Sequence, residues 1–264
     1  MFDFGAFAWF GFSLPMKERA RLLRAAGYDA VMLWWGDEFR ETDGPKETHP
    51  GIFRREGIRV ENVHLPYYGI NALWTDTLDG TAQLDRLVAC IDACGAAEIP
   101  VAVLHLTESG DAPLPNTIGL DRLHRLVAQA EERNVVLAAE NLYNAVHLDF
   151  AFAEIPSQAL AFCFDSGHAH CSGLGAEVLT RYDRPVAALH LHDNDGKSDQ
   201  HRLPFNGSAD WPLIMQTLRA RGYTGALMLE VDASFNDHRT DGADWTPETY
   251  LAEGITRLKQ LQTL

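Results

Sequence analysis

Residues 135–140 read Val-Val-Leu-Ala-Ala-Glu, a short apolar run that ends in a single carboxylate. A run of this length without polar alternation is typical of a strand that is covered on both faces, as in a parallel sheet. The amphipathic stretch Leu120–Arg133 precedes it, and a second apolar run, Ala159–Asp165, follows it and again ends in an acid. Helices that alternate with buried strands in this way indicate repeated β/α units.

The same alternation extends over the whole chain. Eight apolar runs predict strands at Phe4–Phe10, Ala30–Trp34, Ile58–His64, Val101–His105, Val135–Glu140, Ala159–Asp165, Val186–His192 and Ala226–Glu230. The clearest helical patterns cover Met16–Ala26, Thr81–Ala93, Leu120–Arg133, Trp211–Arg221 and Pro247–Leu261, and residues 38–55 and 144–156 have weaker ones. Eight strands separated by helices predict the α/β class and a (β/α)8 TIM barrel. The alternative is an open doubly wound sheet, but residues 10–13, Phe-Gly-Phe-Ser, lack the glycine fingerprint of a dinucleotide-binding sheet.

The composition fits an acidic globular protein. Lys and Arg number 22 and Asp and Glu number 37, which gives a net charge of −15, and 46% of the residues are hydrophobic. That apolar content excludes a disordered chain. The excess of acids argues against a nucleic-acid partner, because phosphate backbones are bound largely through Lys and Arg. No shift in composition marks a boundary, so we expect residues 1–264 to form a single domain.

The sequence also bears on location. No stretch approaches the roughly 20 apolar residues that span a bilayer, and the apolar start Phe2–Phe12 contains Asp3 and has no basic residue before it, unlike a signal peptide. The four cysteines form no CxxC pair, which argues against a zinc ribbon or a thioredoxin-like site. We therefore expect a cytoplasmic protein without a membrane partner.

Polar residues terminate most of the predicted strands. They are His64, His105, Glu140, Asp165, His190 or His192, and Glu230. In a barrel these ends emerge at one face, where such folds hold their active sites, so residues far apart in the chain converge there. A lone histidine at a strand end is more often structural, but six such ends out of eight indicate a shared site.

Three further groups, His168, Asp199 and His201, follow the same strand ends. Carboxylates and imidazoles without a thiolate suit a divalent metal such as Zn²⁺ or Mn²⁺. These nine candidates exceed the roughly four to six ligands of one ion, so they predict one to three ions or additional contacts to a substrate. The other histidines, His49, His124, His147, His170 and His238, lack this placement and are expected on helices or at the surface.

In motif and in order, these residues resemble the xylose isomerase-like TIM-barrel superfamily, which includes sugar isomerases and epimerases, inosose dehydratase-like enzymes and endonuclease IV. The resemblance extends from Phe4 to about Leu261. It rests on Glu61-Asn-Val-His64, Val103-Leu-His105, Ala139-Glu140-Asn141, Phe164-Asp-Ser-Gly-His168, Leu189-His-Leu-His-Asp-Asn-Asp195 with Asp199-Gln-His201, and Leu227-Met-Leu-Glu230.

The resemblance implies a metal site. In the isomerases and epimerases of this superfamily, the shared metal is held by a Glu, an Asp, a His and a second Glu, which match Glu140, Asp165, His190 and Glu230. The superfamily motif on the seventh strand reads His-x-x-acid. It fits His190 with Asp193, and it also fits His192 with Asp195. The ligand on that strand therefore stays open, with His190 preferred.

Five other residues resemble the additional ligands of endonuclease IV, which binds three zinc ions. They are His64, His105, His168, Asp199 and His201. Simple ketose epimerases generally lack the Asp-x-His pair. Against an endonuclease IV-like activity, the sequence lacks basic insertions of the kind that contact DNA. Arg202 is the one basic residue that directly follows the Asp-x-His pair.

The first activity implied by the resemblance is a metal-dependent isomerase or epimerase of a small sugar, sugar phosphate or polyol-ketone. One of the two glutamates, Glu140 and Glu230, would act as the base and the other as the acid beside a metal-bound carbonyl, and His168 would hold a substrate hydroxyl. The expected substrate contacts are His192, Trp34, Tyr67 and Arg202, with Trp35, Tyr68 and Trp74 as further aromatic candidates. A homodimer is expected by family habit.

The second activity is that of a multi-zinc phosphodiesterase or hydrolase similar to endonuclease IV. It accounts better for Asp199 and His201 and worse for the acidic charge. A non-catalytic metal- or sugar-binding barrel is the third alternative. In each case, specificity is expected to depend on the loops Gly36–Arg55, Tyr67–Gly80 and Ser234–Trp245.

Overall fold

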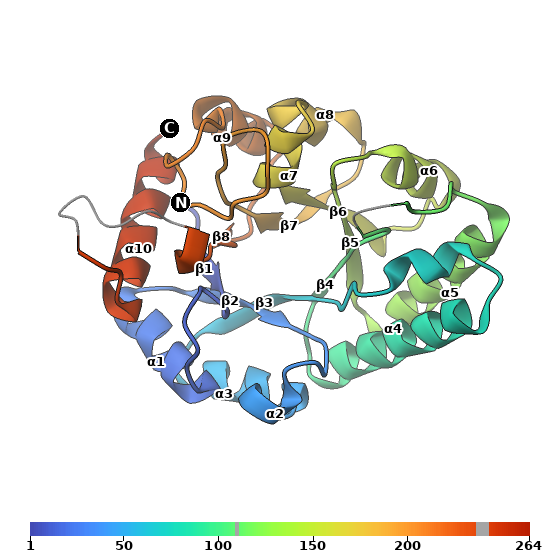
Figure 1. Ribbon diagram of the computed structural model, residues 1–264, viewed down its shortest axis with the longest axis horizontal. Coiled ribbons are helices and arrows are strands. Elements are labelled where there is room, and N and C mark those ends of the chain that lie inside the picture. Colours follow the sequence, from blue (N-terminus) through green and yellow to red (C-terminus); the bar gives the residue numbers. More distant parts are fainter. Residues whose placement is uncertain (109–110, 236–242) are drawn as a thin grey trace.

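The computed structural model describes residues 1–108, 111–235 and 243–264. Eight parallel strands form its centre: β1 Phe4–Phe7, β2 Ala30–Trp34, β3 Arg59–His64, β4 Val101–Leu104, β5 Val136–Glu140, β6 Leu160–Asp165, β7 Val186–His190 and β8 Leu227–Leu229. Neighbouring strands follow the order β7-β6-β5-β4-β3-β2-β1-β8, and a parallel bridge between Leu191 and Leu229 joins the two ends. Helices surround this ring of strands (Figure 1). The (β/α)8 barrel predicted from the sequence is confirmed.

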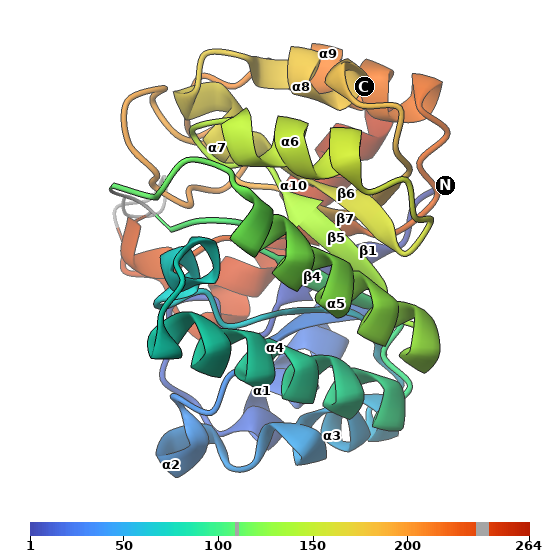
Figure 2. The same ribbon diagram turned by 90° about the vertical axis from the view of Figure 1, so that its right-hand side faces the viewer.

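The helices also follow the predicted pattern. The five clear patterns form α1 Met16–Ala26, α4 Leu78–Ala96, α5 Thr117–Arg133, α9 Trp211–Ala220 and α10 Pro247–Thr263. The two weaker regions contain α2 Arg40–Asp43, η1 Lys46–Thr48, α3 His49–Arg55 and α6 Val146–Glu154. Figure 2 looks onto α4, α5 and α6, which lie in succession along one side of the barrel.

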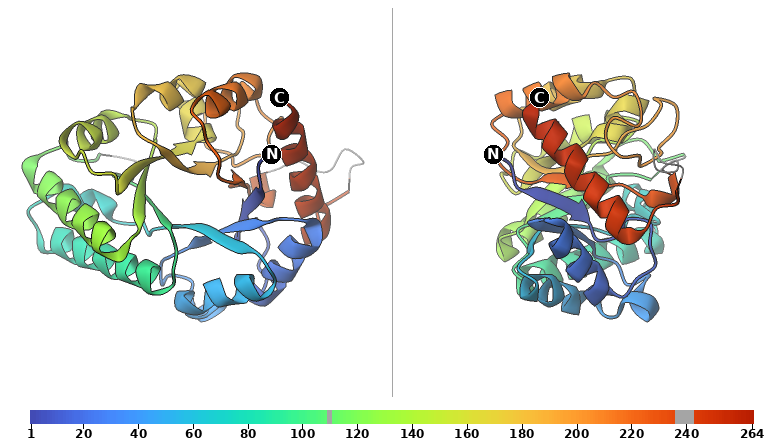
Figure 3. Two further views of the ribbon diagram at one scale, coloured as in Figure 1. Left: turned by 180° about the vertical axis from the view of Figure 1, so that it is seen from behind. Right: turned by 90° about the vertical axis from the view of Figure 1, so that its left-hand side faces the viewer.

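Some short helices lie outside the predicted patterns. The connection from β6 to β7 contains α7 Ser166–Cys171, η3 Gly175–Glu177 and α8 Val178–Arg181, and the 3-10 turns η2 Ile70–Trp74 and η4 Ala233–Phe235 follow β3 and β8. These pieces are too short to show a helical period. The first and last parts of the chain lie close together, where the Phe2 backbone N–H donates to Gln262 Oε1 at 2.8 Å (Figure 3).

Four strands end earlier than predicted on the side where the polar residues lie, β4 and β8 by one residue and β1 and β7 by more. β1 ends at Phe7 rather than Phe10, and β7 ends at His190 rather than His192. Gly11, with φ of 93°, turns the chain after Phe10, a conformation that favours glycine. At His192 the backbone N–H donates to Ser166 Oγ at 2.9 Å, so it is diverted from strand pairing to a side chain.

A layer of small side chains fills the barrel interior below the strand ends. Val103, Ala138, Cys163 and Ala188 are completely buried and form one cluster. They stand two residues before His105, Glu140, Asp165 and His190, respectively. Since alternate residues of a strand share a face, this layer is an apolar floor beneath those polar side chains.

The cysteines of this protein are not joined in disulfides. All four cysteines are free thiols, and Cys90, Cys94 and Cys163 are buried. Burial raises the pKa of Cys163 to about 12, so this thiol stays protonated and packs as a small apolar group. Within the described ranges, none of the helices combines the length and the apolar character needed to span a bilayer.

Candidate metal centre

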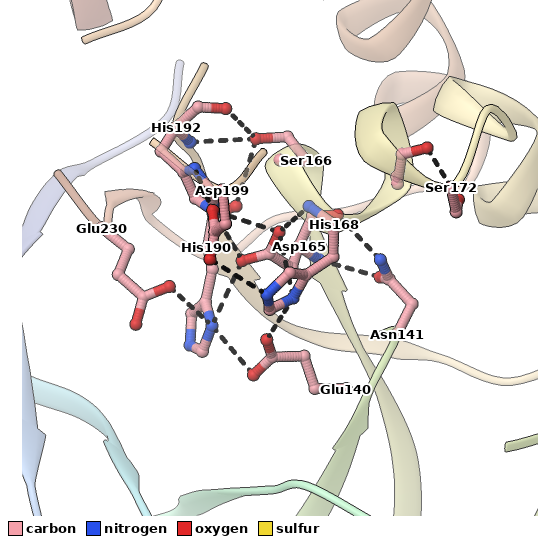
Figure 4. Close-up of polar contacts among 12 residues, drawn as sticks. Glu140, Asn141, Asp165, Ser166, His168, Ser172, His190, His192, Asp199 and Glu230 are labelled. Carbon is pink, nitrogen blue, oxygen red and sulfur yellow. Dashed lines mark hydrogen bonds and ion pairs between the residues drawn. The ribbon is translucent and has the colours of Figure 1, made fainter. Parts of the chain in front are cut away.

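The structure brings all nine predicted ligands together at one end of the barrel. His64, Glu140, Asp165 and His190 are the last residues of β3, β5, β6 and β7, and His105 and Glu230 directly follow β4 and β8. His168 belongs to α7, and Asp199 and His201 lie in the loop between β7 and α9. Figure 4 shows Glu140, Asp165, His168, His190, Asp199 and Glu230 pointing toward a common centre. Four sets of three side chains have donor atoms within 4.8 Å of one another: His64, Glu140 and His190; Glu140, Asp165 and His168; Asp165, His190 and Glu230; and His192, His201 and Glu230.

The first part of the centre joins β3, β4 and β5. His64 Nε2 lies 3.2 Å from His105 Nε2, and these nitrogens lie 3.5 and 3.2 Å from Glu140 Oε2. His64 Nδ1 lies 2.8 Å from the Leu65 carbonyl oxygen. A carbonyl can only accept, so Nδ1 carries the hydrogen and the lone pair of neutral His64 is on Nε2, directed at the centre.

The second part is built around His190. Its Nδ1 lies 3.1 Å from Glu140 Oε2, 3.3 Å from Glu230 Oε2 and 3.9 Å from Asp165 Oδ2. His190, Glu140 and Asp165 are completely buried or nearly so, whereas Glu230 is partly exposed. Three carboxylates around one imidazole nitrogen form a set of hard ligands with one histidine.

The third part lies toward the loop after β7. Asp199 Oδ2 is 3.4 Å from His168 Nε2 and 3.1 Å from His201 Nε2. His201 Nδ1 lies 2.9 Å from the Glu230 carbonyl oxygen, so it donates there and Nε2 faces Asp199. The Asp-x-His pair is therefore part of the same cluster as the strand-end residues.

His192 contacts this cluster through Asp165 and His201. Its Nε2 lies 3.0 and 3.1 Å from the two Asp165 carboxylate oxygens, and its ring stacks on His201 with centroids 4.2 Å apart. Gly167 is required for this packing, because a Cβ at that position would lie 1.9 Å from His192 Cε1. The geometry favours His190 over His192 as a ligand beside Glu140 and Glu230, and gives His192 contact with the Asp165 carboxylate.

Asp193 fixes the loop that carries Asp199 and His201. Its carboxylate accepts hydrogen bonds from the backbone N–H groups of Asn194, Phe205 and Ala209 and from Trp211 Nε1, at 2.9, 2.9, 3.1 and 2.9 Å. Two backbone hydrogen bonds with Arg202 add to these. Asp193 is completely buried, and it holds together residues 193 to 211 rather than facing the cluster.

The protonation of the centre depends on the mutual effects of its acids and imidazoles. Burial would raise the pKa of Glu140, but the imidazoles of His105 and His190 lower it well below its ordinary value. Burial disfavours the charged form of His168, but Asp165 and Asp199 raise its pKa well above the ordinary value. Asp199 and Glu230 similarly outweigh burial at His201 and raise its pKa to about 10. When no cation is bound, imidazolium groups balance the carboxylates.

The donor atoms fit a bound cation. Six buried atoms of the centre make no hydrogen bond of good geometry among the described residues, although most of them lie 3.1–3.6 Å from a charged group of the same cluster: Glu140 Oε2, His168 Nδ1, His190 Nδ1 and Nε2, His192 Nδ1 and Asp199 Oδ1. Buried polar groups without partners are costly, and a metal ion supplies the missing interaction. The donors are carboxylate oxygens and imidazole nitrogens without a thiolate, a set that suits Zn²⁺ or Mn²⁺.

A cavity of about 670 Å³ opens onto one side of the centre. Its described lining includes His64, Asp199, His201 and Glu230 from the cluster, and Trp34 and Tyr67 among the aromatic residues. Trp34 stacks on His64 with centroids 5.5 Å apart, and Tyr67 stacks on His105 at 4.6 Å. Both aromatic residues predicted as substrate contacts therefore border the cavity and the centre.

Other predicted contacts lie elsewhere. Arg202 and His192 are not among the described lining residues, and Arg202 Nη1 donates to the Asn206 carbonyl at 3.3 Å. Trp35 and Trp74 were wrong as lining candidates, because both are buried in the core and donate to the carbonyls of Cys90 and Leu106. Their adjacency in sequence to loop residues does not indicate the direction of their side chains.

The structure adds lining residues that the sequence did not single out, namely Trp9, Phe39 and the ion pair of Arg19 with Asp43. Arg19 interrupts the apolar face of α1 between Met16 and Leu23, a signal that sequence reasoning could have used. Four of the histidines expected outside the site, His49, His124, His147 and His170, do lie on helices, although His49 also lines the cavity. His238 and residues 236–242 of the third specificity loop lie outside the described residues.

Comparison with known proteins agrees with this fold. The family model described as "Xylose isomerase-like TIM barrel" matches residues 20–261, and the chain belongs to this family. An uncharacterized protein of Sinorhizobium fredii is 32% identical over 154 residues, which cover 53% of this chain and 50% of that protein. The chain thus spans half the length of this relative.

More distant relatives match over nearly the whole chain. Fructoselysine 3-epimerase of Shigella flexneri is 22% identical over 271 residues, covering 94% of each protein. A D-tagatose 3-epimerase-like protein has a solved structure with a TM-score of 0.76 at 17% identity, covering 99% of this chain and 97% of its own. The IOLI protein, solved with a binding zinc atom, has a TM-score of 0.77 at 15% identity, with 99% and 98% covered. At these identities the solved structures support the fold.

Asp193→Asn should weaken the third part of the centre selectively. The amide replaces one acceptor oxygen by a donor that faces N–H groups, so we expect unfolding to become easier by about 2 kcal/mol. We also expect metal affinity attributable to Asp199 and His201 to fall. Urea unfolding and metal titration would measure both effects. Asp195→Asn is the matched control, since Asp195 is exposed in the same loop. Equal effects of the two variants would contradict this role of Asp193.

Metal binding should strengthen as the pH rises. The raised pKa values of His168, His190 and His201 mean that these imidazoles carry protons that a cation must displace. We expect the affinity for Zn²⁺ or Mn²⁺ to rise by about tenfold per pH unit for each displaced proton between pH 6 and 8. Titration calorimetry in buffers of different ionisation enthalpy would count the protons. His201→Gln should release about one fewer, and binding without proton release would contradict the assignment.

Proposed function

We propose that this protein is a divalent-metal-dependent sugar isomerase or epimerase, whose active site is the candidate metal centre and the adjoining cavity. One observation carries the proposal. Glu230 contacts His190 within the metal centre and also lines the cavity, so the metal centre and the cavity share a residue. Membership in the xylose isomerase-like family and the relatives that are sugar 3-epimerases support it. Residues 1–264 are proposed to act as a single domain.

Glu140, Asp165, His190 and Glu230 are the residues proposed to hold the principal cation. When bound there, a divalent cation supplies a Lewis acid that polarises a substrate carbonyl group. Glu140 Oε2 and His190 Nδ1 support this choice of ligands, because they lie 3.1 Å apart but make no hydrogen bond of good geometry. The zinc atom in the structurally similar IOLI protein is consistent with a metal in this fold.

The side chains of the chain itself would move the proton. Glu230 is the carboxylate best placed to remove a proton from the carbon next to the carbonyl, because it is partly exposed and borders the cavity. Glu140, which lies across His190 from Glu230, is proposed as the second member of the acid–base pair. His168, between Asp165 and Asp199, is proposed to hold a substrate hydroxyl.

A multi-zinc phosphodiesterase is the second candidate. The third part of the centre favours it, because His168, Asp199 and His201 lie in contact and form a further ligand group with a shared carboxylate. Two or three cations would then clamp a phosphate and activate water. The net charge of −15 and the aromatic cavity favour the sugar enzyme. A panel of ketoses and an abasic-site duplex, assayed side by side, would separate the candidates.

Glu140→Gln and Glu230→Gln should each abolish turnover of the ketose substrate while the fold is retained. An amide cannot accept the transferred proton, and general acid–base groups contribute about 10²–10⁴-fold to the rate. Steady-state kinetics would measure the loss, and circular dichroism would verify the fold. Glu154→Gln, an exposed glutamate on α6, is the control and should keep the wild-type rate. Activity retained in either active-site variant would rule out the acid–base pair.

Removing the metal should abolish turnover reversibly. We expect at least one tightly bound divalent ion per chain by elemental analysis, and lost activity after dialysis against a chelator, because the proposed reaction requires a polarised carbonyl. Added Mn²⁺ or Zn²⁺ should restore it. One ion per chain supports the isomerase, whereas two or three zinc ions support the phosphodiesterase. Full activity in metal-depleted protein would refute the metal-dependent proposal.

A further inference from the structure

The aromatic surface of the protein is concentrated around the candidate site. Five aromatic side chains in the described ranges are strongly exposed, and four of them, Trp9, Phe39, Tyr68 and Phe235, line the 670 Å³ cavity. The fifth, Tyr143, lies with its ring centroid 5.2 Å from that of His168. Exposed apolar surface gathered at one place marks a binding site rather than ordinary surface composition. The cavity therefore offers an apolar ligand surface directly beside the metal centre.

The aromatic rings are held in place rather than loosely packed. Trp34 Nε1 donates to Glu38 Oε2 at 2.9 Å, while its ring stacks on His64 and lies edge-on to Phe39, with centroids 6.2 Å apart. Trp9 Nε1 donates to Asp232 Oδ2 at 3.0 Å. Rings that are fixed before the ligand arrives lose little conformational freedom on binding. This favours stacking against a flat or apolar part of a ligand.

The size of the cavity exceeds what a bare monosaccharide needs. Cavities of about 300–1,000 Å³ accommodate drug-sized ligands, and this one lies in the middle of that range. Phe39 and Tyr68 contact the Trp34 ring, with centroids 6.2 and 6.0 Å away, and Trp34 in turn stacks on His64. We expect a sugar whose carbonyl end lies at His64 and Glu230 to leave these two rings uncovered. A substituent on the sugar would cover them.

The charges around the cavity disfavour a phosphate as that substituent. Arg19 is the one Lys or Arg among the described lining residues, and its Nη1 and Nη2 both donate to the Asp43 carboxylate at 3.1 Å. The guanidinium charge is thus matched within the protein. Asp232, which is not part of the candidate metal centre, adds a carboxylate to the same lining. A phosphate placed away from the metal centre would meet like charge, which reduces affinity.

We propose that the substrate is an unphosphorylated sugar derivative with an uncharged apolar substituent, such as an aryl or alkyl group, that packs against Trp9, Phe39 and Tyr68. This inference rests on the proposed sugar isomerase or epimerase function and adds the substrate class to it. The sugar end takes the position beside the metal centre, and the substituent extends along the aromatic side of the cavity. Arg19 and Asp43, as a neutral pair, offer no net positive charge to an anionic group on that side.

Three ligands that differ only at one oxygen test the inference: D-fructose, 6-O-benzyl-D-fructose and D-fructose 6-phosphate. Titration calorimetry on the metal-loaded protein would give their affinities. We expect the benzyl derivative to bind at least about tenfold more tightly than fructose, equivalent to about 1.4 kcal/mol, and the phosphate to bind no better than fructose. Phosphate binding as tight as that of the benzyl derivative, or no measurable preference for the benzyl group, would overturn the inference.

Two variants and one control variant locate the effect. Phe39→Ala should lower the ratio of benzyl to fructose affinity by about fivefold to tenfold, because it removes a ring from the apolar side of the cavity. Leu213→Ala is the control, since Leu213 is an exposed apolar residue on α9 and does not line the cavity. Asp43→Asn should raise the relative affinity of the phosphate by unmasking the Arg19 charge. An unchanged benzyl ratio in Phe39→Ala would count against the inference, and the wild-type comparison remains decisive if Asp43→Asn does not fold.

Turnover assays with the same three ligands test the proposed reaction separately from the proposed ligand class. Epimerisation or isomerisation of each ligand is followed separately by nuclear magnetic resonance. A benzyl preference in binding with no turnover of any ketose would overturn the proposed reaction and support the ligand class. Turnover with a preference for the phosphate would support the reaction and overturn the ligand class.

Discussion

Four carboxylates, those of Glu140, Asp165, Asp199 and Glu230, share one end of the barrel at distances at which they must be balanced by positive charge. Two of them are almost completely buried, where an unbalanced charge would be prohibitively costly. The surrounding imidazoles or a cation supply the balance. The rest of the arrangement at this end of the barrel is organised around that requirement: strands that end at a candidate ligand, an apolar floor beneath, and a loop held in place by the buried Asp193.

The sequence predicted the barrel and its polar end because both depend on local patterns that the fold repeats. Each strand is a short apolar run. Where a strand reaches the end of the apolar barrel interior, its last residue is polar, as at Glu140 and Asp165. Parallel strands direct such residues to one face, so their convergence follows from topology without knowledge of side-chain positions. His168 and the pair of Asp199 and His201 were found in the same way, through their place just after a strand.

What the sequence could not supply lies in contacts between elements distant in the chain. Trp34 and Trp35 are adjacent, yet one lines the cavity and the other is buried and bonds to Cys90. The pairing of Arg19 with Asp43 joins α1 to α2 and has no local signature. The short helix α7 was missed because six residues carry no period, although its start is fixed by Asp165, which caps it through a 2.6 Å hydrogen bond from the His168 N–H.

The orientation of two candidate ligands has a further consequence. His64 and His201 each donate a ring hydrogen to a main-chain carbonyl, that of Leu65 and that of Glu230. A carbonyl belongs to every residue type, so replacement of either side chain at those two carbonyl positions leaves the acceptor in place. The tautomer of both imidazoles is thereby protected against point substitution, and the surrounding loops are able to diverge in sequence during evolution while the same ring nitrogens continue to face inward.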